Sequence, residues 1–329
     1  MWPFRRTENN SGKLIPDPVG VVLVLGVLAS LVVGLATAPR AGRPAARAAG
    51  SRAVGLIYVD GVITGGESAA GLFGASTGSD SVLAQLKEAR EDPGVKAVVL
   101  RINSPGGSAP AAQEIGDEIE RLRKAGKLVV ASMGDVAASG GYWIAAMSDR
   151  IIAEPATLTG SIGVIMQLTN MQNFYGKIGF SYETFKSGPH KDMGSSVRPV
   201  SPEERAIFQS MIDDIYGQFV NVVAQGRNMP VERVRAIADG RVFTGRQAKT
   251  AGLVDELGNF NYALDRAATL AGLGKDYEVR EFGKLTPIER LLNQLAGAAS
   301  LRLPFAAGSV PAAPGPAGLY LLFVPPAMQ

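Results

Sequence analysis

The stretch VKAVVLRINSPGGSAPAAQEIGDEIERLRKAGKLVVASM, residues Val95–Met133, decides the fold class. It contains two short apolar runs, Val95–Ile102 and Lys127–Met133, which are rich in β-branched residues and bounded by turn-forming residues. Such runs are typical of buried strands. Between them, residues 110–124 carry apolar side chains at the spacing of one helix face. A strand, a helix and a second strand in this order predict a parallel pair joined by a crossover helix.

The same alternation continues along the rest of the chain. Further elements are expected as a strand over Val54–Ile63, a helix over 81–91, a helix from about Ser139 and a strand over Arg150–Glu154. A long amphipathic helix should begin near Ser201, where Ser-Pro-Glu-Glu is a typical start signal. Its apolar face is Phe208, Ile212, Ile215, Phe219 and Val222. The pattern predicts an α/β fold with a largely parallel sheet.

Composition excludes several kinds of protein. The 329 residues suffice for one large domain or two small ones, and a net charge of +3 without a basic cluster predicts no nucleic-acid partner. The absence of cysteine excludes thiol catalysis, disulfides and cysteine-based metal sites. A single histidine, His190, excludes a zinc site built on several histidines. We therefore expect neither a metal nor a cofactor.

Residues 18–39 contain no charged side chain. A helix of that length would reach roughly 33 Å, which is enough to cross a hydrocarbon core of about 30 Å. We predict a transmembrane anchor there, after a tail over 1–17 and before an Ala/Gly/Arg-rich linker over 40–52. A cleaved secretory signal is the alternative, because Ala36-Thr37-Ala38 has the form of a cleavage site. Basic residues flank the segment on both sides and leave its orientation open.

The main domain is expected over 53–295. Within it, Thr64–Asp80 is rich in Gly, Ser and Ala and is predicted to be a loose connection. The tail over 296–329 is rich in Ala, Pro and Gly, although it ends near the apolar sequence GLYLLFV.

Two short motifs follow successive predicted strands. Asn103-Ser104-Pro105-Gly106-Gly107 follows the first strand, and Ser139-Gly140-Gly141 comes shortly after the second. Glycines at the carboxyl end of a strand let backbone N–H groups approach a ligand and stabilise an oxyanion, but they also form ordinary turns. Ser139 could be a nucleophile or a helix cap. The G-x-S-x-G elbow motif is absent, since Ala137 stands in place of its first glycine.

Taken together, Asp135–Val164 and Ser187–Ser195 resemble the signal peptide peptidase A group of the S49 serine peptidases, in its short form. The resemblance covers about residues 53–273 and implies a crotonase-like fold, shared with the proteolytic subunit of the Clp protease. It implies that Ser139 is the nucleophile and Lys191 its general base. By the same resemblance, Gly107, together with Gly106, and Gly140 would supply oxyanion-hole N–H groups, and Ser161 would orient the lysine.

The resemblance also implies a setting for the protein. The anchor would cross the cytoplasmic (inner) membrane once and hold the catalytic domain on its extracytoplasmic side. The chain would form a homo-oligomeric ring, and its substrates would be signal peptide remnants and other apolar peptides.

A lysine base must be neutral near pH 7, although the ordinary pKa of lysine is about 10.4. Burial can lower that pKa, whereas a nearby carboxylate raises it. Asp192 directly follows Lys191, so we expect its side chain to point away. Three alternatives remain from the sequence: a Ser–His–Asp hydrolase using Ser139, His190 and an acid such as Asp149, a non-hydrolytic crotonase-type enzyme acting on CoA esters, and a catalytically inactive scaffold.

Overall fold

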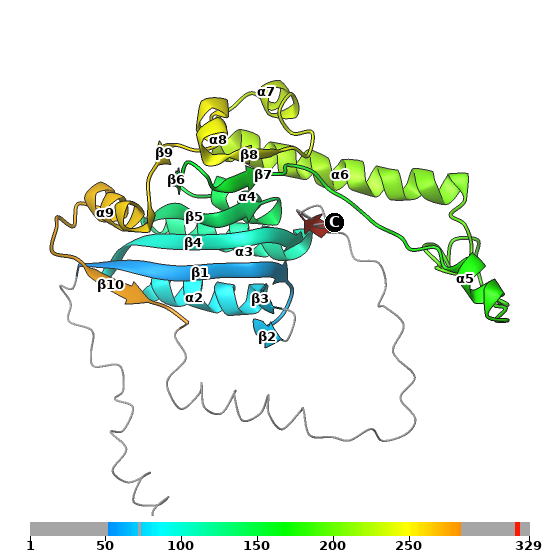
Figure 1. Cartoon of the computed structure of the whole chain (residues 1–329). Coiled ribbons are helices and arrows are strands. Elements are labelled where there is room, and N and C mark those ends of the chain that lie inside the picture. Colours follow the sequence, from blue (N-terminus) through cyan, green and yellow to red (C-terminus); the bar gives the residue numbers. More distant parts are fainter. Residues whose placement is uncertain (1–51, 72–73, 284–319, 323–329) are drawn as a thin grey trace, which may run out of the picture. The chain divides into compact units, whose positions relative to one another are not determined.

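The computed structural model describes residues 52–71, 74–283 and 320–322. A single sheet runs through this part of the chain, with its strands in the order β2-β3-β1-β4-β5-β6-β9 (Figure 1). Strands β10 and β11 pair with β1 and β4, and β7 bridges β5 and β8. The strands are β1 (Ala53–Thr64), β2 (Ala69–Gly71), β3 (Gly74–Gly78), β4 (Val95–Ser108), β5 (Leu128–Ala138), β6 (Arg150–Ala153), β7 (Leu158–Gly160), β8 (Val242–Thr244), β9 (Glu256–Leu257), β10 (Glu278–Glu281) and β11 (Tyr320–Leu322).

Helices cover both faces of this sheet. They are α2 (Ser79–Glu91), α3 (Ala109–Lys124), α4 (Gly140–Ala146), α5 (Gln172–Lys177), α6 (Pro202–Gly226), α7 (Val231–Arg235), α8 (Gly245–Ala251) and α9 (Phe260–Leu270). In β4, Val98 and Leu100 join the core under α2, α3 and α4, whereas Ala97 and Val99 join the core under α9. Alternate residues of a strand point to opposite faces, so the continuous apolar run of β4 is buried on both sides.

The predicted alternation of strands and helices is confirmed. The pairings of β1 with β4, β4 with β5, β5 with β6 and β6 with β9 are all parallel. The fold is therefore a mixed α/β fold with a largely parallel central sheet. The antiparallel pairs lie outside this series: β2 with β3, β7 with β8 and β11 with β4.

Two local expectations were wrong. Thr64–Asp80 is not a loose connection, because it contains β2 and β3. Strand β3 extends the sheet beside the end of β1, where the Thr77 hydroxyl donates to the Asp60 carbonyl and accepts from the Asp60 N–H. In addition, β4 does not end at Ile102 but continues through the Pro-Gly-Gly sequence to Ser108. Its pairing with β1 at Gly106 and Gly107 keeps that sequence extended.

The long amphipathic helix α6 begins as predicted. The Ser201 hydroxyl accepts the N–H of Glu204, and the Glu204 carboxylate accepts the N–H of Ser201, which completes a capping box. Of the five residues of the predicted apolar face, only Phe219 is fully buried. Phe219 is fully buried against Trp143 of α4, with ring centroids 5.0 Å apart, whereas Phe208 and Ile212 are half-buried.

The residues before this buried half form an extension that we call the arm, residues 166–211. The arm contains α5, the turns that follow it and the first part of α6, and α5 lies at its far end (Figure 1). The structure describes every residue from 163 to 218, and none of the apolar side chains in this segment is buried. Phe185 is 88% exposed, and Phe174, Ile178, Phe180 and Tyr182 are exposed as well. The arm therefore lacks a core of its own.

Several sequence predictions fall on other parts of the chain. The predicted anchor over 18–39 and nearly all of the tail over 296–329 lie outside the described residues. Among the helices that the structure does describe, none combines the length and apolarity needed to span a membrane.

Candidate active site

Ser139 occupies a sharp turn between β5 and α4. Its backbone has φ 54° and ψ −117°, a conformation that is uncommon for a residue other than glycine and costs about 1–3 kcal/mol. Although Ser139 stands at the N-cap position of α4, its side chain makes no capping hydrogen bond. The residue is buried, and its carbonyl accepts the N–H of Trp143 at 2.9 Å. A strained strand-to-helix turn, of the kind that carries the nucleophile in α/β-hydrolases, is thus present without the G-x-S-x-G sequence.

Small residues let the end of β4 approach this turn. A Cβ atom on Gly140 would lie 3.3 Å from the Gly107 nitrogen, and one on Gly141 would lie 3.0 Å from the Ser104 carbonyl oxygen. The predicted glycines on β4 and after β5 are therefore neighbours in space. A side chain at Gly140 or Gly141 would push the end of β4 away from the turn at Ser139.

The two glycines of β4 differ in what their backbones can offer. The Gly106 N–H donates to the Ser104 hydroxyl oxygen at 3.1 Å, so it already has a partner within β4. Gly107 has a φ of 156°, and a Cβ there would lie 2.0 Å from the Ile63 carbonyl oxygen. This position accepts only glycine. Of the three predicted oxyanion-hole residues, only Gly106 is shown with its N–H engaged by a side chain within the described residues.

Ser161 lies beside Ser139 because β7 pairs with the end of β5. Ala138 is opposite Gly160 in this parallel pair, and the Ser139 N–H donates to the Gly160 carbonyl at 2.8 Å. Ser161 is buried, has a φ of 49° and donates its N–H to the Arg241 carbonyl at 2.9 Å. Ser139 and Ser161 are two of the three non-glycine residues with positive φ in the described part of the chain. Strain is therefore concentrated at this point of the fold.

A cavity of about 610 Å³ opens next to Ser161. Its walls are the segment after Ser161, the middle of α6 and the turn before β8: Gly163, Val164, Ile165, Ile212, Asp213, Tyr216, Ala238, Asp239 and Gly240. The lining is mixed, with aliphatic and aromatic groups beside two carboxylates. It has room for a side chain beside Ser161.

Lys191 lies on the arm, apart from these serines. It is exposed on a turn, where its N–H donates to the Gly188 carbonyl at 3.2 Å. The neighbouring His190 lies 3.4 Å from Glu203, in the first turn of α6. Helix α6 is about 37 Å long, and Gly226 at its other end packs against the Ala146 carbonyl of α4. Among the described residues, no hydrogen bond or ion pair joins Lys191 to Ser139.

The acid of the alternative triad is also elsewhere. Asp149 accepts from Arg123 at 2.7 Å and from the Val129 N–H at 2.8 Å, at the beginning of β5, whereas Ser139 follows the end of that strand. Ser139, His190 and Asp149 do not meet within the described chain. In that same part, no group of three or more His, Asp and Glu side chains could hold a metal ion.

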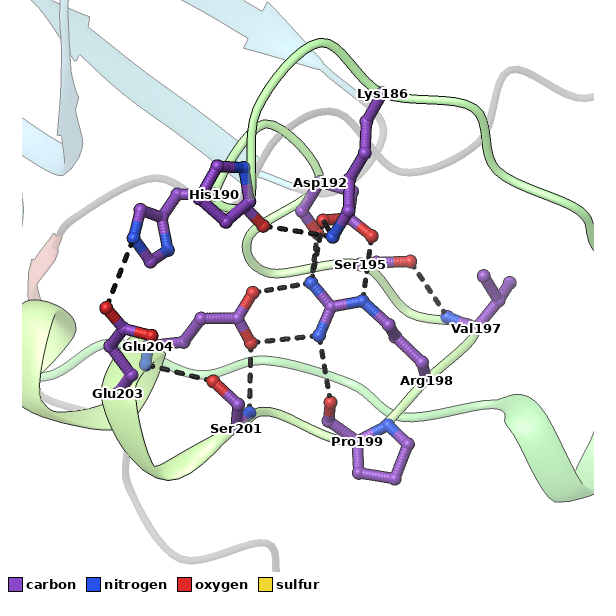
Figure 2. Close-up of polar contacts among 11 residues, drawn as sticks. Lys186, His190, Asp192, Ser195, Val197, Arg198, Pro199, Ser201, Glu203 and Glu204 are labelled. Carbon is purple, nitrogen blue, oxygen red and sulfur yellow. Dashed lines mark hydrogen bonds and ion pairs between the residues drawn. The ribbon is translucent and has the colours of Figure 1, made fainter.

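Sequence reasoning missed a charged cluster around the Lys191 turn (Figure 2). Arg198 donates to both oxygens of Asp192 at 2.8 Å and to Glu204 at 2.9 Å, and Lys186 donates to Asp192 at 2.7 Å. The hydrogen bonds from Arg198 lower the pKa of Glu204 to about 2 and hold the pKa of Asp192 well below its usual value. The capping box was the only sequence signal for Glu204, and no local pattern pointed to Arg198.

Comparisons with known proteins find relatives among proteases. Residues 121–274 match Peptidase family S49. A Synechocystis protein provisionally named protease slr0021 is 48% identical over 61% of this chain and 72% of its own length. Protease 4 of Salmonella typhi is 38% identical over 79% of this chain and 41% of its own length, and the chloroplastic serine protease SPPA of Arabidopsis thaliana is 36% identical over 69% and 34%. The chain thus spans less than half of the last two.

Among solved structures, a ClpP1 mutant from Listeria monocytogenes aligns with 64% of this chain and 94% of its own, with a TM-score of 0.41 and 18% identity. From the family match, which spans Ser139, Ser161 and the arm, and from the 48% identity to a protein of which the chain covers 72%, we conclude that the chain belongs to peptidase family S49 and is a relative of serine proteases.

Proposed function

We propose that the protein is a membrane-anchored serine endopeptidase with a Ser139–Lys191 dyad, which cleaves signal peptide remnants and other apolar peptides. The observation that carries the proposal is the strained backbone of Ser139, whose hydroxyl is not used as a helix cap, next to Gly107, Gly140 and Ser161. We also infer that the sheet is of the crotonase and Clp-protease type that the family resemblance implies.

The chemistry follows from these positions. The Ser139 hydroxyl attacks the peptide carbonyl carbon while its proton passes to the neutral Lys191 amine. The N–H groups of Gly107 and Gly140 stabilise the resulting oxyanion. When the C–N bond breaks, the Lys191 ammonium returns the proton to the leaving amine, and an acyl group remains on Ser139. Water, deprotonated by Lys191, then hydrolyses this ester and regenerates the serine.

The pairing of β11 supports a path for an extended substrate. At Gly106 and Gly107, β4 pairs with β1 on one edge and antiparallel with Leu322 and Leu321 of β11 on the other. That second edge is the one that β5 occupies as far as Ala137, opposite Ser104. Strand β11 therefore continues the row of β5 beyond Ala137, two residues before Ser139. We propose that peptide substrates add to β4 in this slot as an antiparallel strand.

The arm supports a proposal of assembly. Lys191 has no contact with Ser139 within the described chain, and the arm exposes several large apolar side chains. We propose a homo-oligomeric ring in which the arm of one subunit packs against the next and brings Lys191 to that subunit's Ser139. The contact would cover the aromatic residues of the arm and remove Lys191 from water, which favours its neutral form.

For the N-terminal segment we propose a single membrane-spanning anchor over 18–39 at the cytoplasmic membrane, with the catalytic domain outside the cytoplasm. Its support is the uncharged stretch itself. The full chain should stay in the membrane fraction in high salt and dissolve in detergent. Protease added to intact spheroplasts should digest the main domain, and complete protection until lysis would reverse the orientation.

The function is tested by cleavage of an apolar peptide by the full-length protein in detergent. Ser139→Ala and Lys191→Ala should each reduce the rate to near background, while circular dichroism and the melting temperature stay close to those of the wild type. Mixing the two inactive variants before assembly should restore part of the activity, because some sites then combine an intact serine with an intact lysine. Cleavage by Ser139→Ala above a few per cent would refute the assignment.

A further inference from the structure

We propose that Arg198 is a positioning residue for the general base: together with Lys186 it neutralises Asp192, so that this carboxylate does not hold the adjacent Lys191 as an ammonium ion. The inference rests on the proposed Ser139–Lys191 dyad and adds a reason why a lysine next to an aspartate can serve as a base.

The Asp192 carboxylate is bound by two cationic side chains, Arg198 and Lys186. Arg198 approaches it in a forked arrangement, with Nε 2.8 Å from Oδ2 and Nη2 2.8 Å from Oδ1, and Lys186 Nζ is 2.7 Å from Oδ1. The Asp192 side chain is only 14% exposed. A forked guanidinium–carboxylate pair is directional, so it holds the carboxylate in one orientation as well as neutralising it.

The same guanidinium attaches the turn to α6. Arg198 Nη1 lies 2.9 Å from Oε2 of Glu204, and the Glu204 carboxylate also accepts the N–H of Ser201 in the capping box. Lys191 is the residue immediately before Asp192. Figure 2 shows Arg198 lying between the two carboxylates, so a single side chain links the Lys191 turn to the first turn of the helix.

Arg198 and Lys186 together balance the charges of the Asp192 and Glu204 carboxylates. The titratable and charged groups that hydrogen bonds or ion pairs join around the turn are Lys186, His190, Asp192, Arg198, Glu203 and Glu204. Glu203 faces His190, and Glu204 faces Arg198. Without Arg198, two carboxylates that now share one guanidinium would be left with Lys186 alone. Their net negative charge beside Lys191 would favour its protonated form.

The test is the pH dependence of kcat/KM for apolar-peptide cleavage by the full-length protein. The rate should rise with pH as Lys191 loses its proton, and the midpoint of this rising limb reports the pKa of the base. In Arg198→Gln the midpoint should move upward by about half a pH unit, which is the effect of removing one charge roughly 7 Å away in a water-like medium. At a pH below the limb this is an approximately threefold lower rate. Arg198→Lys should keep the wild-type limb, because the charge is retained.

Asp192 supplies the reciprocal variant. Asp192→Asn alone should move the limb to lower pH, and Arg198→Gln combined with Asp192→Asn should return it close to the wild-type position. Asp192→Asn also keeps the proposal testable if Arg198→Gln does not fold. A limb that stays in place in Asp192→Asn, or one that remains raised in the double variant, would overturn the neutralisation.

Arg121→Gln is a matched control. Glu118 is bound by Arg90 and Arg121, each at 2.9 Å, just as Asp192 is bound by two cations, and the change removes the same single charge. Its limb should not move, and an equal shift would mean that overall charge, rather than the Asp192 contact, sets the pH profile. If Lys191→Ala keeps full activity, the dyad itself is wrong, an outcome separate from an unmoved limb in the Arg198 and Asp192 variants.

Discussion

The backbone N–H of Ser139 donates a 2.8 Å hydrogen bond to the carbonyl oxygen of Gly160. This bond closes the parallel pair of β5 and β7 at the point where both strands end. Both Ser139 and the next residue after Gly160, Ser161, have positive φ angles. One backbone contact thus holds two strained turns against each other, and the position of the candidate nucleophile depends on the geometry of β7.

Gly160→Ala should therefore disturb Ser139 without touching it. Gly160 has a φ of 81°, and a Cβ there would lie 2.6 Å from the Phe243 ring. We expect a loss of stability of about 1–3 kcal/mol and slower labelling of Ser139 by a fluorophosphonate. Thermal melting and the labelling rate measure the two effects. Gly65→Ala, at a position outside the helices and the arm with open space around it, is the control and should change neither.

Gly107→Ala should be more severe because its new methyl group meets backbone. The Cβ would lie 2.0 Å from the Ile63 carbonyl oxygen, which cannot move without breaking the β1–β4 pairing. If Gly107 donates to the oxyanion, kcat should fall by about 10²-fold or more. Peptide cleavage measured well below the melting temperature separates this loss from unfolding. A Gly107→Ala enzyme with wild-type kcat would exclude this residue from the oxyanion hole.

Substitutions at two adjacent residues distinguish a lysine base from a histidine base. Lys191→Ala should lower kcat by orders of magnitude, since a serine hydroxyl is a weak nucleophile without a base. His190→Gln should cost far less, because the structure pairs this imidazole with Glu203. The two rates and their pH profiles answer the question. An inactive His190→Gln enzyme beside an active Lys191→Ala enzyme would restore the triad interpretation.

Acid should loosen the Lys191 turn before it unfolds the main domain. The pKa of Glu204 is lowered from 4.5 to about 2, chiefly by hydrogen bonds from Arg198. A carboxyl group with a lowered pKa contributes stability above pH 4.5 that is lost as the pH falls toward about 2. Limited pepsin digestion across this range should cut the arm first. In Glu204→Gln the arm should already be cleaved readily near pH 4.5.

Removal of residues 319–329 should make the peptide slot on β4 more accessible. Strand β11 pairs with Gly106–Ser108, where we propose that substrates bind, so it should compete with them. We expect KM for an apolar peptide to fall several-fold with kcat unchanged, and a synthetic GLYLLFV peptide to inhibit competitively. Removal of residues 323–329 alone keeps β11 and is the matched control. An unchanged KM together with no inhibition would refute competition.

Much of the fold could be predicted from local sequence patterns. The continuous apolar runs of β1, β4 and β5 are typical of strands buried on both faces, and the apolar face of α3 follows the 3.6-residue period of a helix. The capping box at Ser201 and Glu204 is likewise a local signal. Such features can be read from neighbouring residues, because the interactions that make them span a few positions of the chain.

Tertiary structure decided what depends on distant partners. The chain extends through Pro105 and Gly106 only because β1 lies beside them, and β3 forms because the end of β1 offers an edge. The strained φ of Ser139 and its contact with Gly160 require β7 to be in register with β5. Arg198 can link Asp192 to Glu204 only when the turn that contains Lys191 packs against the start of α6. Strand pairing and ion pairing depend on which residues are neighbours in space. The sequence by itself therefore determined the helices and strands, and the packed structure determined which of their residues form the site.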